Sequence, residues 1–304
     1  MSVQIIPYAG WQTCLRLSNA EIDLVVTAEV GPRVIRFGFA GGPNEFAEYP
    51  EQCGLTGDDQ WHAYGGHRLW HSPEVRPRTT YPDNRPVEWC LEDQTLVLRA
   101  PVETTTGIQK EIRLWLDPMG NHVHVTHRLS NCGPWAVPLA AWAISVMAPG
   151  GRAIVPQETH VSHTERLLPV RPLALWGYTD MSDARFTWGR RFIQLRQDSQ
   201  AQTPQKFGVL CTLGWAAYVH DDHLFLKRFP YVPDATYPDF GCNAEFFTNH
   251  RMLEVESLGP MTDLGAGESL THEEDWYLFR GVAVGVTEEA IGAALQPLLP
   301  RARG

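Results

Sequence analysis

Short apolar segments separated by turn residues recur along the whole chain. Many of them alternate apolar and polar positions with a period of two, which is the period of a half-buried strand: EIDLVVTAEV, RVIRFGFA, TLVLRAPV, IQKEIRLWL, HVHVTHRLS, FGVLCTLGWAAYV, HLFLKRF, MLEVESL and DWYLFRGVAV. Few segments keep a helical period for three turns, and 26 Gly and 23 Pro mark the turns between runs. The pattern predicts an all-β fold, an antiparallel β-sandwich rather than alternating βαβ units.

One helix is expected, close to the C-terminus. Thr287 can cap the segment EEAIGAALQ, two glutamates occupy its first turn, and Pro297 ends it. No internal repeat, low-complexity tract or charged linker divides the chain, so we expect residues 1–304 to form a single domain. The Pro-rich stretch 71–88 is long for a connection, which is typical of a functional loop.

Composition narrows the possible partners. The chain has 35 acidic and 25 basic residues, a formal charge of −10, and no Lys/Arg-rich block, so it is not expected to bind nucleic acid. It has no apolar stretch of about 18 residues and no signal-peptide pattern at its start, so no membrane association is expected. Its six cysteines are scattered without a CxxC pair, which favours reduced thiols in the cytoplasm. A neutral, hydroxyl-rich small molecule would suit this acidic surface.

The segment MLEVESLGP carries two glutamates on what reads as a buried strand. Because successive side chains alternate between faces, its apolar residues point one way, and Glu254 and Glu256 point the other. Such a pair lies either on a solvent-exposed strand edge or in a functional site. Glu245, among aromatic residues, precedes it. A carboxylate near apolar walls and near a second carboxylate has a raised pKa, which suits a general acid or base.

The segment YGGHRLWHSPE concentrates polar and aromatic residues directly after two glycines. The guanidinium of Arg68 can donate hydrogen bonds to hydroxyl groups, and the indole of Trp70 offers an apolar platform to a sugar ring. His67 and His71 lie within the same few positions. The alternative interpretation is a glycine-containing turn that leads into a strand, with both histidines bonded to the backbone.

Two histidine pairs raise the question of a metal ion. His67 and His71 would share one face only on a helix, which the flanking glycines and Pro73 disfavour. His122 and His124 share a strand face, but no third ligand follows at zinc-site spacing. We therefore expect no metal and no other cofactor.

A third segment, LALWGYTDMSDARFTWG, mixes aromatic residues with short acids and arginine. Trp176, Tyr178, Asp180 and Arg185 would suit a cleft that binds a carbohydrate, although ordinary loop and core packing explains them nearly as well. The chain has no serine nucleophile elbow, dinucleotide-binding glycine fingerprint or P-loop.

The C-terminal part of the chain, MLEVESLGP followed by LGAGESLTHEEDWYL, resembles the closing strands of the galactose mutarotase-like (aldose 1-epimerase) superfamily. The order of YGGHRLWHSPE, YPDN, LWGYTD and LEVESLGP is similar to an uncharacterised branch of it. The resemblance implies a large two-sheet β-supersandwich. It also implies that Glu254 is the base that takes the anomeric proton. In LAAWAIS, Trp142 stands where the family has its acid histidine.

Two functions follow as hypotheses. The first is an aldose epimerase or mutarotase, with Glu254 as the base and His67 or His71 as the acid that protonates the ring oxygen. The second is a carbohydrate-binding or sensing module that uses the same cleft without catalysis. A weaker third hypothesis is a glycosidase-like hydrolase that uses Glu245 with Glu254 or Glu256. The residues expected to contact the sugar are Arg68, Trp70, Trp142, Asp180, Glu245 and Glu256.

Overall fold

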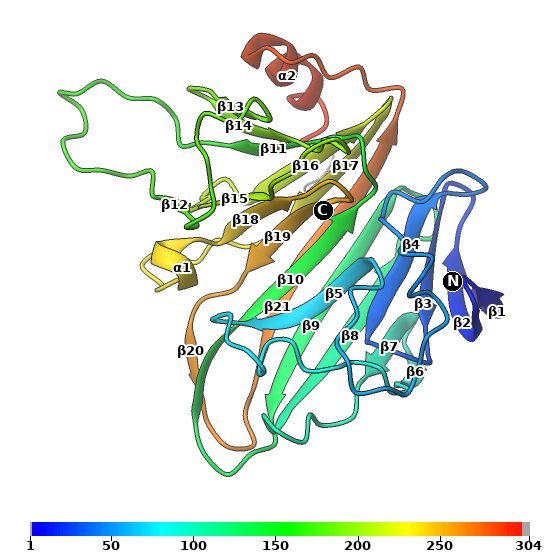
Figure 1. The fold of residues 1–304 in the computed structure, drawn as a ribbon. Coiled ribbons are helices and arrows are strands. Elements are labelled where there is room, and N and C mark those ends of the chain that lie inside the picture. Colours follow the sequence, from blue (N-terminus) through cyan, green and yellow to red (C-terminus); the bar gives the residue numbers. More distant parts are fainter. Residues whose placement is uncertain (1, 300–304) are drawn as a thin grey trace.

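Two large antiparallel sheets lie face to face (Figure 1). The computed structural model describes residues 2–299. The larger sheet has 11 strands, in the order β1 (Ser2–Tyr8), β2 (Trp11–Ser18), β3 (Ile22–Thr27), β4 (Arg33–Phe39), β5 (Gly66–Ser72), β10 (Val137–Met147), β19 (Leu253–Leu258), β18 (Ala244–Thr248), β15 (Gln205–Val209) and β12 (Leu173–Leu175), with β20 (Thr262–Leu264) paired to β10.

The smaller sheet has 10 strands. Their order is β13 (Phe186–Trp188), β14 (Phe192–Arg196), β11 (Arg152–Pro156), β16 (Trp215–His220), β17 (His223–Arg228), β21 (Ser269–Arg280), β9 (His122–Asn131), β8 (Ile108–Leu116), β7 (Thr95–Arg99) and β6 (Glu88–Glu92). The predicted all-β, two-sheet architecture is confirmed.

The core fills the space between the sheets, as the alternating pattern requires. Leu253 and Val255 of β19 enter this core from the larger sheet. Phe37 of β4 meets Trp276 of β21 with ring centroids 5.7 Å apart, so the two sheets share one apolar layer. The core therefore draws on both sheets, and a single domain stays a prediction.

The described chain has two short helices, α1 (Pro238–Gly241) and α2 (Glu288–Leu295). Helix α2 is the one predicted from the sequence, and the Thr287 side chain accepts a hydrogen bond from the backbone of Ala290 at its N-terminus. Sequence reasoning did not find α1, in which Asp239 and Phe240 have positive φ angles of 48° and 63°. Among the described residues no helix is long and apolar enough to cross a membrane.

One predicted strand is wrong in extent. The run FGVLCTLGWAAYV forms two strands, β15 and β16, which belong to different sheets. The chain turns between them where Gly214 adopts a φ of +65° and its N–H bonds to the carbonyl of Cys211. Glycine takes this conformation without the steric cost that a Cβ would add.

Candidate functional site

The strands at the centre of the larger sheet present two different sets of side chains. On β5, Leu69 joins the core between the sheets, whereas Arg68 and Trp70 point to the opposite side. On β19, Leu253 and Val255 face the core, and Glu254 therefore lies on the same side as Arg68. We call this side of the larger sheet, which turns away from the smaller sheet, the outer face.

Neighbouring strands bring residues that are distant in sequence together on the outer face. β10 lies between β5 and β19, and Trp142 pairs with Trp70 on one side and with Leu258 on the other. On the far side of β19, Glu256 pairs with Glu245 of β18. The predicted residues Arg68, Trp70, Trp142, Glu245, Glu254 and Glu256 thus lie on one continuous patch of the outer face.

Arg68 and Glu254 form a nearly buried ion pair. The Nη2 of Arg68 donates to Oε1 of Glu254 at 2.9 Å, and their side chains are 4% and 11% exposed. The guanidinium lies over the ring of Trp70, 4.6 Å from its centroid, and 5.9 Å from that of Trp61. Its Nε and Nη1 are buried and have no hydrogen-bond partner. Because unpaired buried donors are costly, these two atoms are suited to receive a ligand oxygen.

A second charged group lies beside this pair. Nζ of Lys206 on β15 lies 2.7 Å from Glu245 and 3.3 Å from Glu256. Burial raises the pKa of both carboxyl groups, more than the Lys206 ammonium lowers it. Burial alone would lower the pKa of Lys206, but Glu256 and Glu245 outweigh it and hold that pKa above its ordinary value.

Tryptophan rings enclose this second group. Nε1 of Trp142 donates to Oε2 of Glu256 at 2.7 Å. Nζ of Lys206 lies 4.8 Å from the ring centroid of Trp142 and 4.5 Å from that of Trp176, which is the geometry of a cation–π contact on two sides. The outer face therefore combines aromatic platforms with carboxylates and cations.

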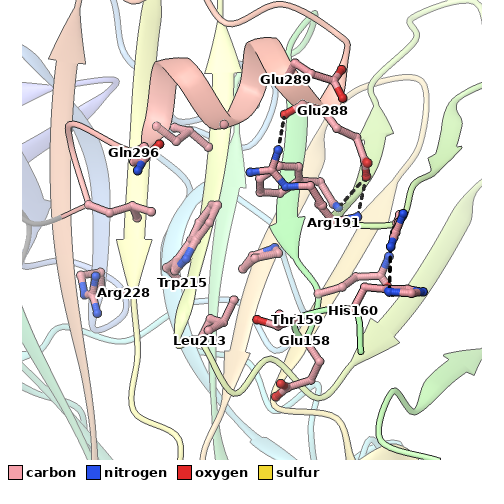
Figure 2. Close-up of a pocket in the computed structure, with 17 residues that line it drawn as sticks. Glu158, Thr159, His160, Arg191, Leu213, Trp215, Arg228, Glu288, Glu289 and Gln296 are labelled. Atoms are coloured by element: carbon pink, nitrogen blue, oxygen red, sulfur yellow. Dashed lines mark hydrogen bonds between the residues drawn. The ribbon is translucent and has the colours of Figure 1, made fainter. Parts of the chain in front are cut away.

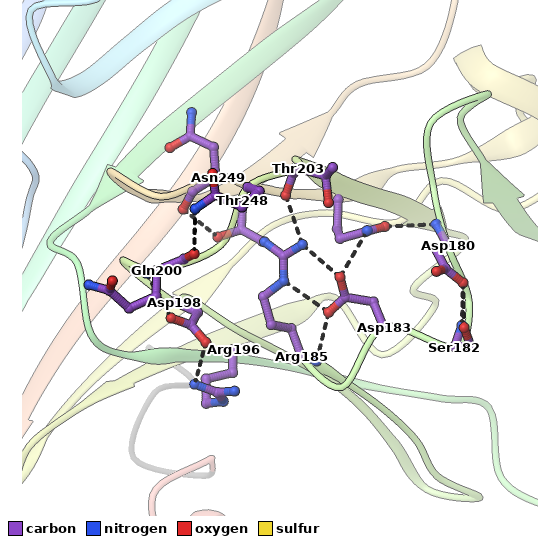
Figure 3. Close-up of polar contacts among 12 residues, drawn as sticks. Asp180, Ser182, Asp183, Arg185, Arg196, Asp198, Gln200, Thr203, Thr248 and Asn249 are labelled. Atoms are coloured by element: carbon purple, nitrogen blue, oxygen red, sulfur yellow. Dashed lines mark hydrogen bonds and ion pairs between the residues drawn. The ribbon is translucent and has the colours of Figure 1, made fainter.

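The loop that supplies Trp176 is held by a buried arginine (Figure 3). Arg185 donates to both oxygens of Asp183, at 2.9 and 2.7 Å, and to the carbonyl of Thr203. Gln205 of β15 donates to Asp183 and accepts from the backbone N–H of Asp180. These contacts fix the loop against the strand that carries Lys206.

The two predicted acids do not lie on the outer face. His67 and His71 are fully buried between the sheets, because residues one position away from Arg68 and Trp70 must point to the other side of the strand. Burial lowers the pKa of both rings. The expectation that either histidine protonates a sugar bound beside Glu254 is therefore wrong.

His67 belongs to a polar network between the sheets. His127 donates through Nδ1 to the carbonyl of His272, which leaves its Nε2 to accept from His67 at 2.7 Å. His67, His127 and Glu274 place potential metal-binding atoms within 4.8 Å of one another. Glu274, however, is already neutralised by Lys227 at 2.8 Å, and a divalent ion would add unbalanced positive charge. We interpret the group as a hydrogen-bond network, and metal-free catalysis stays a prediction.

Other predicted residues have structural roles. Asp180 is exposed, and its carboxylate accepts from the backbone and hydroxyl of Ser182 within its own turn, so it is not expected to contact the sugar. His122 and His124 both contact Asp275, at 2.7 and 2.9 Å. Sequence reasoning missed Lys206 altogether; the available signal was a lysine directly before the apolar run of the strand QKFGV.

A separate cavity of about 670 Å³ lies on the smaller sheet, below α2 (Figure 2). It contains none of the predicted site residues. Several of its polar groups are already paired: Glu288 accepts from the backbone of Arg191, and Arg190 donates to His160. We place the candidate site on the outer face because that face has unpaired buried donors and acceptors, including Oε1 of Glu256.

The protein has the galactose mutarotase-like fold. A candidate aldose 1-epimerase from Klebsiella pneumoniae aligns with 98% of this chain and 86% of its own, at 12% identity and a TM-score of 0.64. A galactose mutarotase-like protein from Lactobacillus casei aligns with 88% of this chain and all of its own, at 12% identity and a TM-score of 0.52. A TPR-domain containing protein from Parabacteroides distasonis aligns over 90% of this chain and 49% of its own, at 12% identity and a TM-score of 0.56.

At these identities the likeness concerns the fold alone. No protein-family model matches the sequence, and a search of curated proteins found no match either.

Proposed function

We propose that this protein is a carbohydrate-active isomerase that binds an aldose on the outer face and interconverts its anomers by acid–base chemistry. The observation that carries the proposal is the Arg68–Glu254 pair, which is nearly buried against Trp70 while two guanidinium donors have no partner. Sugar hydroxyls can complete those hydrogen bonds, and the sugar's C–H face can stack on tryptophan.

Glu254 acts as the base in this proposal. It removes the proton of the anomeric hydroxyl, the ring C–O bond opens, and an acid protonates the ring oxygen. Reclosing on the other face of the carbonyl gives the other anomer. Arg68 is ion-paired with Glu254 and orients a hydroxyl beside it. The reaction needs one acid and one base, and no cofactor.

We also propose that the protein is cytoplasmic and that its ligand is uncharged. All six cysteines are free thiols, in keeping with a reducing cytoplasm. Lys206 is paired with two carboxylates and Arg68 with one, so the cations of the patch are already matched by acidic groups. An uncharged sugar suits such a patch.

Replacing Glu254 by Gln tests the assignment of the base. The amide keeps the shape and can still contact Arg68, so sugar binding should persist, whereas anomer interconversion should fall by about 10²–10⁴-fold. NMR saturation transfer between anomers, over a panel of free aldoses, measures both quantities. Glu273→Gln is the matched control, because Glu273 is exposed on β21 of the smaller sheet; it should leave the rate unchanged. Equal rates for wild type and Glu254→Gln would reject Glu254 as the base.

The second candidate is a non-catalytic sugar-binding module. It is favoured by one observation: both predicted acid histidines are buried between the sheets, and Trp142 is bonded to Glu256. Under this hypothesis wild type binds an aldose but exchanges its anomers no faster than buffer does. The hydrolase hypothesis is weaker, because Glu245 is fully buried against Lys206.

A further inference from the structure

We propose that Tyr178 donates the proton to the sugar's ring oxygen. This is the role predicted for His67 or His71, which are buried between the sheets. The proposal rests on the proposed function, and it concerns a residue of the LWGYTD segment that the acid–base scheme above does not use. It is carried by the position of the Tyr178 ring over the strands that hold Glu254, by its exposure, and by its free hydroxyl.

The ring position follows from the sheet register. Phe247 of β18 lies directly opposite Glu254 of β19, and on its other side opposite Lys206 of β15. The ring of Tyr178 stands edge-on to the Phe247 ring, with centroids 6.5 Å apart. Directly opposed residues have Cβ atoms about 5 Å apart. Tyr178 is therefore held over the strands that present Glu254 and Lys206 on the outer face.

Hydrogen bonds hold Tyr178 in this position. Tyr178 follows β12, and Thr179 donates through its hydroxyl to the carbonyl of Lys206 at 2.5 Å. A few residues later, Arg185 and Asp183 fasten the same loop to Gln205 (Figure 3). Because β12 pairs with β15 before Tyr178, and these bonds follow it, the segment is bonded to the strand beside the site on both sides.

Exposure distinguishes Tyr178 from the other polar groups here. Its side chain is 44% exposed, whereas Glu254 is 8% exposed and Glu256 is fully buried. Within the described residues its hydroxyl has no hydrogen-bond partner, so it is available to a ligand that lies between the loop and the sheet. Of the ionisable groups of the patch, it is the one that an incoming sugar can reach without displacing a protein contact.

The charged groups around the Tyr178 hydroxyl suit a proton donor. Burial raises the pKa of Tyr178 to about 12; Lys206 lowers it, and Glu256, Glu74 and Glu254 raise it. The hydroxyl is therefore protonated at neutral pH. Lys206 is the neighbouring positive charge that stabilises the phenolate once the proton has left.

The proton transfers balance. As Glu254 takes the anomeric O–H proton, that oxygen's electron pair forms the carbonyl and the ring C–O bond breaks. The ring oxygen keeps the bonding pair and receives the Tyr178 proton. The intermediate is the open-chain aldehyde with a protonated Glu254 and a phenolate. Ring closure reverses each transfer after the carbonyl has rotated, and both residues regain their starting states.

Tyr178→Phe tests the proposal because it removes one oxygen and keeps the ring contact with Phe247. We expect the anomer exchange rate at saturating aldose to fall by at least about 10²-fold. Affinity should fall by no more than about tenfold, the value of one hydrogen bond. Tyr277→Phe is the matched control: burial raises its pKa to about 12 as well, but it packs with α2 on the far side of the smaller sheet. Its rate should equal that of wild type.

The outcomes separate this proposal from the proposed function. Exchange by Tyr178→Phe within about threefold of wild type, with Glu254→Gln inactive, would overturn Tyr178 as the donor and leave the isomerase standing. Wild type that binds aldoses without exchanging them would overturn both. A large loss of rate with a retained affinity, in a variant whose unfolding midpoint matches wild type, supports the proposal.

Discussion

At the scale of single residues, the central group of the outer face is a lysine with two kinds of neighbour. Lys206 lies between two tryptophan rings and contacts two buried carboxyl groups. Burying a charged group costs several kilocalories per mole of lost hydration, and each of these contacts offsets part of that cost. The same lysine contacts Glu245 and Glu256 beside Glu254, and in the proposed mechanism it stabilises the Tyr178 phenolate.

Removing the charge of Lys206 should destabilise the folded protein. Lys206→Met keeps the length of the side chain but leaves two buried carboxyl groups without their cation, so the free energy of unfolding at pH 7 should fall by about 3–5 kcal/mol. At pH 5 the loss should be smaller, because both carboxyl groups can then bind a proton. Urea unfolding at the two pH values measures this. Arg85→Met is the control, since its pair with Asp59 is exposed. Equal effects of Lys206→Met at both pH values would contradict the prediction.

At the scale of elements, the loop between β12 and β13 is positioned by its polar contacts rather than by a core of its own. Arg185 is 4% exposed and its partner Asp183 is 20% exposed. Hydrogen bonds from Arg185 lower the pKa of Asp183 to about 2. This buried pair and its bonds to Gln205 set the place of Trp176 and Tyr178 above the sheet.

Asp183→Asn should therefore loosen the loop without disturbing the sheets. The amide cannot neutralise the buried guanidinium, so we expect amide hydrogens of residues 176–185 to exchange faster, and aldose affinity to fall by about tenfold. Hydrogen–deuterium exchange with mass spectrometry measures the first and NMR titration the second. Asp198→Asn, whose pair with Arg196 is largely exposed, is the control. Unchanged exchange in the loop would show that the pair does not hold it.

At the scale of the whole molecule, the two sheets are joined by a polar layer as well as by apolar packing. His127 and His272 are buried as neutral rings, and Lys227 is paired with Glu274 in the same layer. Burial lowers the pKa of His127, and it lowers that of His272 to about 3. The unfolded chain binds these protons near pH 6.5, whereas the folded chain does not.

Stability should therefore fall as the pH drops below about 6.5. The folded pKa of His272 lies below its unfolded value, so the unfolded state gains the proton first, and each pH unit between about 6.5 and 3 costs about 1.4 kcal/mol from this group alone. Urea midpoints between pH 7.5 and 5.5 measure the slope. His163→Gln, at an exposed position, should leave it unchanged. A flat profile would mean that the buried rings are protonated in the folded state.

The alternating pattern by itself determined the fold class and many of the strands, and the cap and stop residues determined the C-terminal helix. It also determined which neighbours share a face: Arg68 with Trp70, and Glu254 with Glu256, because a strand repeats every two residues. The same rule excludes His67 and His71 from the face of Arg68, so that correction was available from the sequence once the segment was taken as a strand.

Only the tertiary structure decided which strands are neighbours. That β10 lies between β5 and β19, and that β15 closes the patch with Lys206, depends on pairings between distant segments, such as Trp142 opposite Leu258. Local periodicity carries no information about such pairings, because every amphipathic strand offers the same backbone groups to any partner. The division of one apolar run into β15 and β16, and the loop that holds Tyr178 over Phe247, likewise come from packing between distant parts of the chain.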